Sequence, residues 1–305
     1  MYTFIVNPNA RTGLGHKIWN ELETELQNRH VNYQVFFTKY QNHATKIAKE
    51  ITSSHSHCTL IALGGDGTIN EIINGITDLS NVTLGYIPIG SSNDFSRGLN
   101  LSSNPMEALK HILSPSHIAY INIGTLTYGS EKRRFAVSAG IGFDAEVCHK
   151  ISFSKLKVFF NKIKLGKLSY TVVAIQSILM QTPKKMTITL DHNKTVSFDK
   201  TYFAAFMNQK YEGGGFMFCP KAQPGDDLLD LIVVEGLPKL KILFLLPTAF
   251  WGKHTLFHGI HTYQCKNAKM QSEIPLPVHT DGEAIFQQEC ISGTLETEKL
   301  RMIIS

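Results

Sequence analysis

Over residues 1–90, short apolar runs alternate with segments in which apolar side chains recur at helical spacing. The runs predict strands at Phe4–Val6, Tyr33–Thr38, Thr59–Leu63 and Val82–Pro88. Helices are expected between them, the first carrying Ile18, Trp19, Leu22 and Leu26, and the others covering Ala44–Ile51 and Ile69–Ile76. Strands that alternate with helices in short units predict an α/β domain, in which helices cover a parallel sheet.

The pattern changes after about Tyr120, where strand-like pieces are separated by Gly, Asn and Asp turns. They predict an antiparallel β-sandwich built from Ile121–Gly124, Phe135–Ala139, Met186–Leu190, Thr195–Phe198, Tyr202–Met207, Leu229–Val234 and the chain from Ser272 onward. A predicted helix over Lys155–Met180 interrupts this region. We therefore expect two domains, an α/β domain over residues 1–125 and a β-rich domain over residues 126–290.

The composition agrees with a two-domain protein that has a substantial core, since 43% of the 305 residues are hydrophobic. The five cysteines are scattered without a C-x-x-C pair, which favours a reducing compartment and excludes a cysteine zinc site. No run reaches the roughly 18–20 apolar residues of a membrane span. The apolar stretch Ile242–Trp251 is shorter, and we interpret it as a buried core helix, with contact to a membrane surface as the alternative. A net charge of +5 does not require a nucleic-acid partner. A soluble, cytoplasmic protein is expected.

One stretch carries the strongest chemical signal. An apolar run ends at Gly64, Gly65, Asp66, Gly67 and Thr68, and a helical pattern follows from Ile69. The unpaired N–H groups at a helix start attract anions, and glycines let a polyphosphate approach the backbone. The same residues also suit a plain strand-to-helix turn with Asp as the cap. From local chemistry alone, both interpretations stay open.

Two further polar loops follow strands of the same predicted sheet. Residues 7–15 are rich in Asn and Gly, and residues 90–94 read Gly-Ser-Ser-Asn-Asp. The second loop suits either a capped helix start or a site where Ser91 meets a phosphate and Asp94 lies near Mg²⁺. Because ligands of such sheets bind at the carboxyl ends of the strands, the three loops together favour a nucleotide phosphate site.

These motifs resemble those of the diacylglycerol kinase catalytic-domain family, which is related to bacterial lipid kinases, sphingosine kinases and ceramide kinases. The resemblance rests on Gly64–Glu71, Gly90–Phe95, the opening Asn7–Ala10 with Gly13, and the late Val278–Glu283. It implies an NAD-kinase/diacylglycerol-kinase-like fold with a nucleotide-binding first domain and a lipid-binding second domain. Residues 291–305 are then expected as a terminal segment that packs back on the first domain. The implied activity is ATP-dependent, Mg²⁺-assisted phosphoryl transfer to a lipid hydroxyl.

The resemblance also implies roles for individual residues. Asp281 is expected to be the general base, with Glu283 orienting it or the metal, although Asp-Gly is also a common hairpin turn. Asp66 and Asp94 are expected to organise Mg²⁺-ATP. The expected nucleotide-binding residues are Asn7, Pro8, Asn9, Ala10, Arg11, Gly13, Thr38, Gly64, Gly65, Asp66, Gly67, Thr68, Asn70, Ser91 and Asn93.

A second cation site is expected by the same resemblance in the loop over residues 223–228. Asp226 would supply its side chain, with main-chain oxygens from Gln223 and Leu228, although a plain turn is the alternative. Four positions depart from the family pattern, among them Ser91 in place of the usual Thr and Asn122 where some bacterial relatives carry Asp. Asp227 stands where many relatives have Gly, and Arg11 where a small residue is usual.

A lipid substrate implies contact with a membrane surface. The predicted helix over Lys155–Met180 carries five lysines among aromatic and aliphatic residues, which suits a solvated face or an anionic lipid surface. Tyr211–Phe218 is expected to line a lipid cleft, or to be a bulged strand connection. We expect peripheral association with the inner face of the membrane.

Two other functions compete with a lipid kinase. An NAD kinase-like phosphotransferase shares Gly-Gly-Asp-Gly-Thr, but the block Ser92–Phe95 and the late Asp-Gly-Glu disfavour it. A nucleotide-sensing regulator without turnover is disfavoured by the intact set of Asp66, Asp94 and Asp281. The lipid itself stays open among diacylglycerol, phosphatidylglycerol, a sphingoid base and an undecaprenol-like alcohol.

Overall fold

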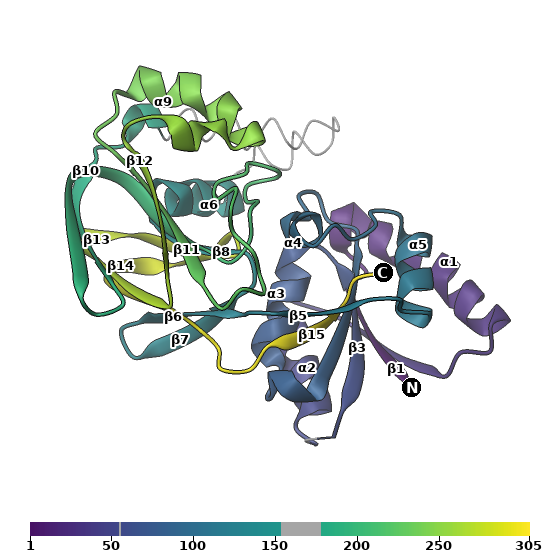
Figure 1. Ribbon diagram of the computed structural model, residues 1–305. Helices are drawn as coiled ribbons and strands as arrows, with labels where there is room; N and C mark the ends of the chain where they lie inside the picture. The colour runs from purple at the N-terminus through teal and green to yellow at the C-terminus, as the bar shows by residue number, and fades with distance from the viewer. Residues whose placement is uncertain (55, 154–177) are drawn as a thin grey trace. The chain divides into compact units, whose positions relative to one another are not determined.

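The computed structural model describes residues 1–54, 56–153 and 178–305 and divides into two compact units, each with its own sheet (Figure 1). Unit 1 consists of Met1–Ile123 together with Glu296–Ser305, and unit 2 of Gly124–Leu295. The chain therefore begins in unit 1, builds the whole of unit 2, and returns to unit 1 for its last residues.

Unit 1 contains a six-stranded sheet that is parallel except at one edge. Its order is β2 (Tyr33–Phe37), β1 (Tyr2–Val6), β3 (Cys58–Gly64), β4 (Val82–Pro88), β15 (Leu300–Ile303) and β5 (Ile118–Ile121). Strand β15 pairs parallel with β4 and antiparallel with β5. The four strands predicted before residue 90 and the α/β class are confirmed. The sequence pattern did not predict that the C-terminal residues would lie inside this sheet as β15.

Helices cover both faces of the sheet of unit 1. Figure 1 shows α1 (Ala10–Asn28) and α5 (Pro105–Leu113) on one face and α2 (His43–Thr52) and α3 (Asp66–Gly75) on the other. Two shorter helices, η1 (Leu79–Asn81) and α4 (Asp94–Gly98), flank β4 in the chain. Helix α1 buries Trp19, Leu22 and Leu26 against the sheet, as their spacing predicted. Helix α3 starts at Asp66, three residues before the predicted start, so Asp66 and Gly67 lie in its first turn.

Unit 2 is antiparallel and folds into two layers through two long strands. Each of β10 (Lys194–Met207) and β13 (Asn267–Thr280) pairs with β9 (Lys184–Leu190) through its first half and with β8 (Ser138–Gly142) through its second. Register shifts in the middle of β10 and β13 bend these strands, so that their two halves lie in different layers. The remaining strands are β11 (Leu229–Glu235), β12 (Ile260–Cys265), β14 (Glu283–Leu295), β6 (Gly124–Tyr128) and β7 (Glu131–Phe135). The predicted sandwich is confirmed.

Two strand predictions in unit 2 were wrong in detail. Thr195–Phe198 and Tyr202–Met207 form one strand, β10, because a bulge rather than a turn separates them. Phe135–Ala139 is not one strand, because the chain leaves β7 at Phe135 and enters β8 at Ser138. The N–H groups of Ala136, Val137 and Ser138 instead bind the carboxylate of Asp281, which interrupts the ladder.

Helices cover one face of the strands β10 and β11. They are α6 (Phe143–Phe153), α9 (Lys239–Leu245), η2 (Leu246–Trp251) and η3 (Lys253–Leu256). A buried cluster under them includes Phe143, Tyr202, Phe203, Ile232 and Leu245. The stretch Ile242–Trp251 is therefore not a core helix, since only one side of it is buried while Phe244 is 80% exposed.

Most of the helix predicted over Lys155–Met180 lies outside the described residues, as do the lysines assigned to it. Among the residues that the structure describes, no helix combines the length and apolar character of a membrane span.

Candidate active site

The three predicted loops meet at the carboxyl ends of β1, β3 and β4. The Asn7 side chain, after β1, donates to Thr68 Oγ1 at 3.1 Å. The Asp66 carboxylate, after β3, accepts from the backbone N–H groups of Asp94 and Phe95, each at 3.2 Å. Loop residues 7–9, 64–68 and 90–94 are therefore tied together directly, as the topology predicted.

The glycines of these loops allow close packing rather than a left-handed backbone. Gly65 has φ −102, and a Cβ on Gly90 would lie 2.6 Å from the Cα of Gly65. A Cβ on Gly64 would lie 2.4 Å from Thr68 Oγ1. Each glycine makes room for another loop or for the start of α3.

Asp66 and Asp94 lie side by side, although each already has a partner. Asp94 is 5% exposed and forms an ion pair with Arg97. The pKa of Tyr86 is raised well above its usual value, mainly by burial and further by the charges of Asp66 and Asp94. The phenol of Tyr86 donates to the Gly64 carbonyl at 3.3 Å. Oxygen donors of this kind suit Mg²⁺, but Arg97 already neutralises Asp94. The donor set fits the metal, with Asp66 as the more accessible ligand.

The first loop is shorter than predicted, because residues from Ala10 onward belong to α1. Only Asn7, Pro8 and Asn9 precede the helix, and Asn9 N–H donates to the Asn7 side chain at 3.1 Å. Within the first turns, Gly13 has φ +90 and Arg11 has φ 50. Arg11 thus occupies a left-handed conformation that favours glycine, which explains why the family pattern has a small residue at this position.

The other predicted nucleotide residues of unit 1 are placed differently. Ser91 is exposed, and the Asn93 side chain donates to the Gly90 carbonyl at 3.2 Å. Thr38, directly after β2, is buried, and its N–H donates to the Val6 carbonyl. Asn70 is fully buried in α3, where its side chain accepts from Asn74 at 3.3 Å. Asn70 therefore lies inside the unit rather than at the loop edge.

Asp281 lies in a tight hairpin turn of unit 2. Thr280 of β13 pairs with Glu283 of β14, leaving Asp281 and Gly282 as the turn residues. Their φ values of 47 and 80 are those of a type I′ turn, for which Asp-Gly is a favoured pair. The hairpin and the functional interpretation of this motif are thus compatible.

The Asp281 carboxylate is held by three backbone groups from the β7–β8 connection. Oδ1 accepts from Val137 and Ser138 at 2.8 and 3.0 Å, and Oδ2 accepts from Ala136 at 2.8 Å. Asp281 N–H in turn donates to the Ser138 carbonyl at 2.8 Å. These three donors fix the orientation of the carboxylate. These backbone partners carry no sequence signal.

Glu283 does not contact the Asp281 carboxylate in any hydrogen bond that the structure shows. Its Oε2 forms an ion pair with Arg133 of β7, and both side chains are about a fifth exposed, 22% for Glu283 and 23% for Arg133. This pair ties β14 to β7 beside the Asp281 turn.

A buried polar cluster behind the turn was missed by the sequence analysis. His279 Nε2 lies 3.0 Å from Asp144 Oδ2 and 3.3 Å from Glu212 Oε1, and the Gly282 backbone nitrogen lies 3.2 Å from His279 Nδ1. Burial lowers the pKa of His279, but the two carboxylates outweigh it and raise the pKa to about 9. A Cβ on Gly140 would lie 1.8 Å from the Asp144 carboxylate, so Gly140 makes room for the cluster. The only sequence signal was His279 next to Asp281.

The loop predicted to hold a second cation is an exposed turn of unit 2. Asp226 Oδ1 accepts from Leu228 N–H at 3.0 Å, and Asp227 has φ 64, a left-handed conformation that favours Gly. Gln223 and Asp226 are exposed. The pKa of Asp230 is raised to about 6, mainly because the side chain is buried. A hydrogen bond from Gln264 lowers this pKa, and the charge of Asp226 raises it. The carboxylate oxygens of Asp226 and Asp230 are ligands of the type that a hard cation prefers.

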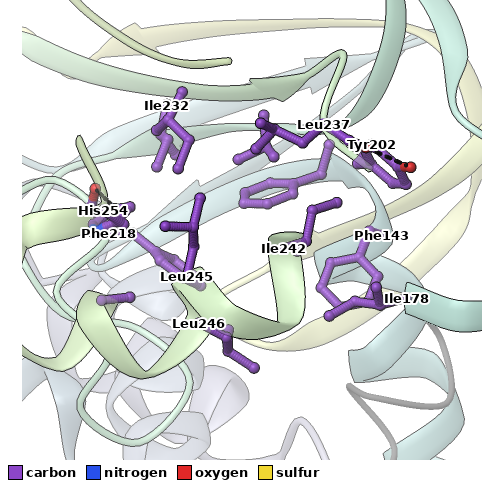
Figure 2. Close-up of a pocket in the computed structure, with 14 residues that line it drawn as sticks. Phe143, Ile178, Tyr202, Phe218, Ile232, Leu237, Ile242, Leu245, Leu246 and His254 are labelled. Carbon is purple, nitrogen blue, oxygen red and sulfur yellow. Dashed lines mark hydrogen bonds between the residues drawn. The ribbon is translucent and has the colours of Figure 1, made fainter. Parts of the chain in front are cut away.

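An apolar cavity, partly open to solvent, lies in unit 2 between the sheet and its covering helices (Figure 2). Its walls come from strands β10 and β11 and from α6, α9 and η2. The lining residues are Phe143, Ile178, Tyr202, Phe203, Phe218, Ile232, Val234, Leu237, Ile242, Leu245, Leu246, Ala249, His254 and Ile260.

Two polar side chains at the cavity wall, Tyr202 and His254, are close enough to backbone carbonyls to form hydrogen bonds. The Tyr202 phenol donates to the Leu237 carbonyl at 3.0 Å, and His254 Nε2 lies 3.1 Å from the Phe218 carbonyl. Burial lowers the pKa of His254, which keeps it neutral. Of the segment Tyr211–Phe218, expected to line a lipid cleft, Phe218 lines this cavity.

Comparison with known proteins agrees with this two-part architecture. Residues 1–126 match the family described as "Diacylglycerol kinase catalytic domain", and residues 137–299 match "YegS C-terminal NAD kinase beta sandwich-like domain". The chain belongs to the diacylglycerol kinase-like family of lipid kinases. Membership of this family implies a kinase, and it confirms the resemblance stated from the motifs.

Named relatives of this family match nearly the whole chain. The Bacillus subtilis (strain 168) protein "Putative lipid kinase YtlR" is 30% identical over 286 residues, covering 92% of each chain. A diacylglycerol kinase of Staphylococcus saprophyticus is 27% identical over 282 residues, covering 92% of this chain and 87% of its own.

Solved structures support the same fold. A Bacillus anthracis structure described as "A putative diacylglycerol kinase" has TM-score 0.78 at 27% identity, covering 100% of this chain and 97% of its own. An NAD kinase from Archaeoglobus fulgidus in complex with ATP has TM-score 0.54 at 13% identity, covering 99% and 93%. The second likeness shows the shared fold alone.

Proposed function

We propose that this member of the diacylglycerol kinase-like family is an ATP-dependent lipid kinase that transfers the γ-phosphoryl group to a lipid hydroxyl. The observation that carries the proposal is the apolar cavity in unit 2, the unit that also holds Asp281. A cavity walled by aliphatic and aromatic side chains suits a hydrocarbon chain and would leave the polar groups of a dinucleotide unsatisfied. The acceptor is therefore a lipid, of the diacylglycerol type.

In the proposed reaction, unit 1 holds the nucleotide phosphates. The start of α3 at Asp66 and Gly67 supplies backbone N–H groups and the positive end of a helix dipole. Asn7, Thr68 and Ser91 add polar side chains around that edge, and the Gly65–Gly90 contact keeps the loops close together. Thr38, at the end of β2, borders the adenosine moiety.

Asp281 acts as the general base in this proposal. Its three backbone donors fix the direction of the carboxylate, and a carboxylate within hydrogen-bond reach of the hydroxyl accepts its proton as the phosphoryl group departs. Glu283 and Arg133 support the turn from the side through their ion pair.

Mg²⁺, when bound, neutralises charge on the transferring phosphates. Asp66 is the ligand that we assign to it, with Asp94 as a second carboxylate released from Arg97. The loop with Gln223, Asp226 and Leu228 is proposed as a separate cation site, which Asp230 would support from beneath. We place the enzyme in the cytoplasm, peripherally associated with the inner face of the membrane.

The direct test is a panel assay with the purified full chain and ATP labelled at the γ position. Extracted lipids, diacylglycerol, phosphatidylglycerol, a sphingoid base, undecaprenol and NAD are offered separately, and mass spectrometry identifies the product. We expect a phosphorylated lipid and no label in NAD. Label in NADP alone would make the chain an NAD kinase, and ATP binding without any product would make it a nucleotide sensor.

A further inference from the structure

The helical segment over the cavity has apolar residues on both of its faces. Its inner face, with Ile242, Leu245 and Ala249, lines the cavity of unit 2 (Figure 2). Its outer face meets solvent, with Phe244 80% and Trp251 68% exposed. A surface helix of a soluble domain ordinarily carries polar residues on that side.

The exposed residues form one stripe rather than isolated positions. Leu240 and Phe244 lie one turn apart on α9, and Pro247 and Phe250 lie one turn apart on the 3-10 helix η2 that follows; all four are exposed, as is Trp251. Phe250, which stacks on Phe216 with ring centroids 4.3 Å apart, joins Trp251 at the end of the stripe. We call Leu240, Phe244, Pro247, Phe250 and Trp251 the α9 ridge. Contiguous apolar surface of this kind marks an interaction site.

The charge around the ridge selects its partner. No Asp or Glu occurs in residues 236–272, whereas Lys239, Lys241 and Lys253 flank the ridge in the chain. Lys241 and Lys253 are exposed. Aromatic and aliphatic side chains beside lysines, in a segment without acidic residues, are typical of surfaces that lie in the headgroup region of anionic bilayers.

We propose that the α9 ridge inserts into the surface of an anionic lipid bilayer, so that the segment that seals the cavity is also the one that contacts the membrane. This inference rests on the proposed function, because it gives a bilayer-resident lipid a short route to the cavity. A second copy of the chain is a poorer partner. A two-fold contact through this ridge would bring its lysines together without acidic residues from residues 236–272 to pair them.

The protein carries its own reporter for this contact. Of the two tryptophans in the chain, Trp19 is 1% exposed and Trp251 is 68% exposed. On addition of vesicles of phosphatidylglycerol and phosphatidylcholine, we expect Trp251 fluorescence to shift to the blue and to be quenched by lipids brominated in their acyl chains. Vesicles of phosphatidylcholine alone should bind more weakly, and added salt should release the protein. Unchanged Trp251 emission with all vesicles would overturn the proposal.

A matched pair of variants locates the surface. Phe244→Asp places a charge on the ridge, and Phe286→Asp does so at another exposed Phe of unit 2, which lies on β14 and is 89% exposed. We expect about a tenfold or larger loss of vesicle binding for the first and little change for the second. Equal losses, or none for Phe244→Asp, would contradict the assignment. A wild-type dimer in sedimentation that Phe244→Asp dissociates would assign the ridge to a second copy instead.

The proposed docking surface and the proposed kinase activity can be tested independently of each other. With a short-chain diacylglycerol dissolved as monomers, Phe244→Asp should retain wild-type turnover, while it loses turnover on vesicles. If the wild type inserts Trp251 into vesicles yet phosphorylates no lipid, the kinase proposal falls and the docking surface stands. If it phosphorylates vesicle lipids while Trp251 stays in water, only the docking surface falls.

Discussion

Gly65 and Gly90 lie backbone against backbone, and this contact joins the two glycine loops of unit 1. A Cβ on Gly90 would lie 2.6 Å from the Cα of Gly65, whereas a Cβ on Gly65 would lie 3.2 Å from the Cα of Gly90. The first distance requires backbone movement, and the second requires only a small adjustment. The geometry of the proposed phosphate site therefore depends on Gly90 more than on Gly65.

Gly90→Ala should destabilise the protein by about 1–3 kcal/mol and weaken ATP binding, because the two loops must separate. Gly65→Ala, as the matched variant, should have the smaller effect on both quantities. Urea unfolding gives the stability, and calorimetry gives the ATP affinity. If Gly90→Ala bound ATP as the wild type does, the loop contact would be irrelevant to the site.

Asp66→Asn should remove the Mg²⁺ dependence of ATP binding. Asn keeps one oxygen to accept from Asp94 or Phe95 N–H but carries no charge, so the loss of stability should be about 1 kcal/mol. Asp78→Asn is the control, since Asp78 caps η1 by accepting from Ser80 N–H at 2.9 Å. Calorimetry with and without Mg²⁺ separates the two variants. A wild-type response to Mg²⁺ in Asp66→Asn would remove Asp66 from the metal site.

His279 should give the protein a stability that decreases at alkaline pH. Its pKa in the folded state is about 9, above the roughly 6.5 of an unfolded histidine. The stabilisation from its protonated form is therefore complete below about pH 6.5 and is lost as pH rises through 9. His279→Asn should show a flatter pH dependence of its urea midpoint between pH 6.5 and 9. The exposed His258→Asn should follow the wild type; identical slopes for all three proteins would disprove the assignment.

Arg11→Gly should stabilise the protein by about 1 kcal/mol, since glycine adopts a φ of 50 without the strain that Arg carries there. Lys17→Gly lies in the same helix and should instead cost about 1 kcal/mol, because its conformation is helical. Thermal unfolding measures both. A loss of stability in Arg11→Gly would mean that contacts of the Arg11 side chain outweigh the strain.

The sequence pattern located unit 1 because its strands and helices have local signals. Three loops at strand ends could be expected to lie close together, and the loops that carry Asn7, Asp66 and Asp94 are joined by hydrogen bonds. Arg11 and Asp227 looked like departures from a glycine pattern, and both adopt the left-handed conformation that explains the pattern.

The features that the sequence pattern did not predict depend on contacts between residues far apart in the chain. Asp281 is held by backbone groups of residues 136–138, more than 140 positions earlier, which also broke a predicted strand. The cluster of His279, Asp144 and Glu212 joins three separate segments. The cavity has walls from strands and helices spread over residues 143–260, and apolar periodicity cannot distinguish a cavity wall from a filled core.

The central claim is that Asp281 takes the proton from a lipid hydroxyl, and transfer of labelled phosphoryl to diacylglycerol by Asp281→Asn tests it most directly. The variant should lose at least about 100-fold in turnover while unit 1 binds ATP unchanged, and Asp199→Asn, an exposed acid of β10, should match the wild type. Thermal unfolding ensures that both variants are compared in the folded state. Wild-type turnover by Asp281→Asn would contradict the account.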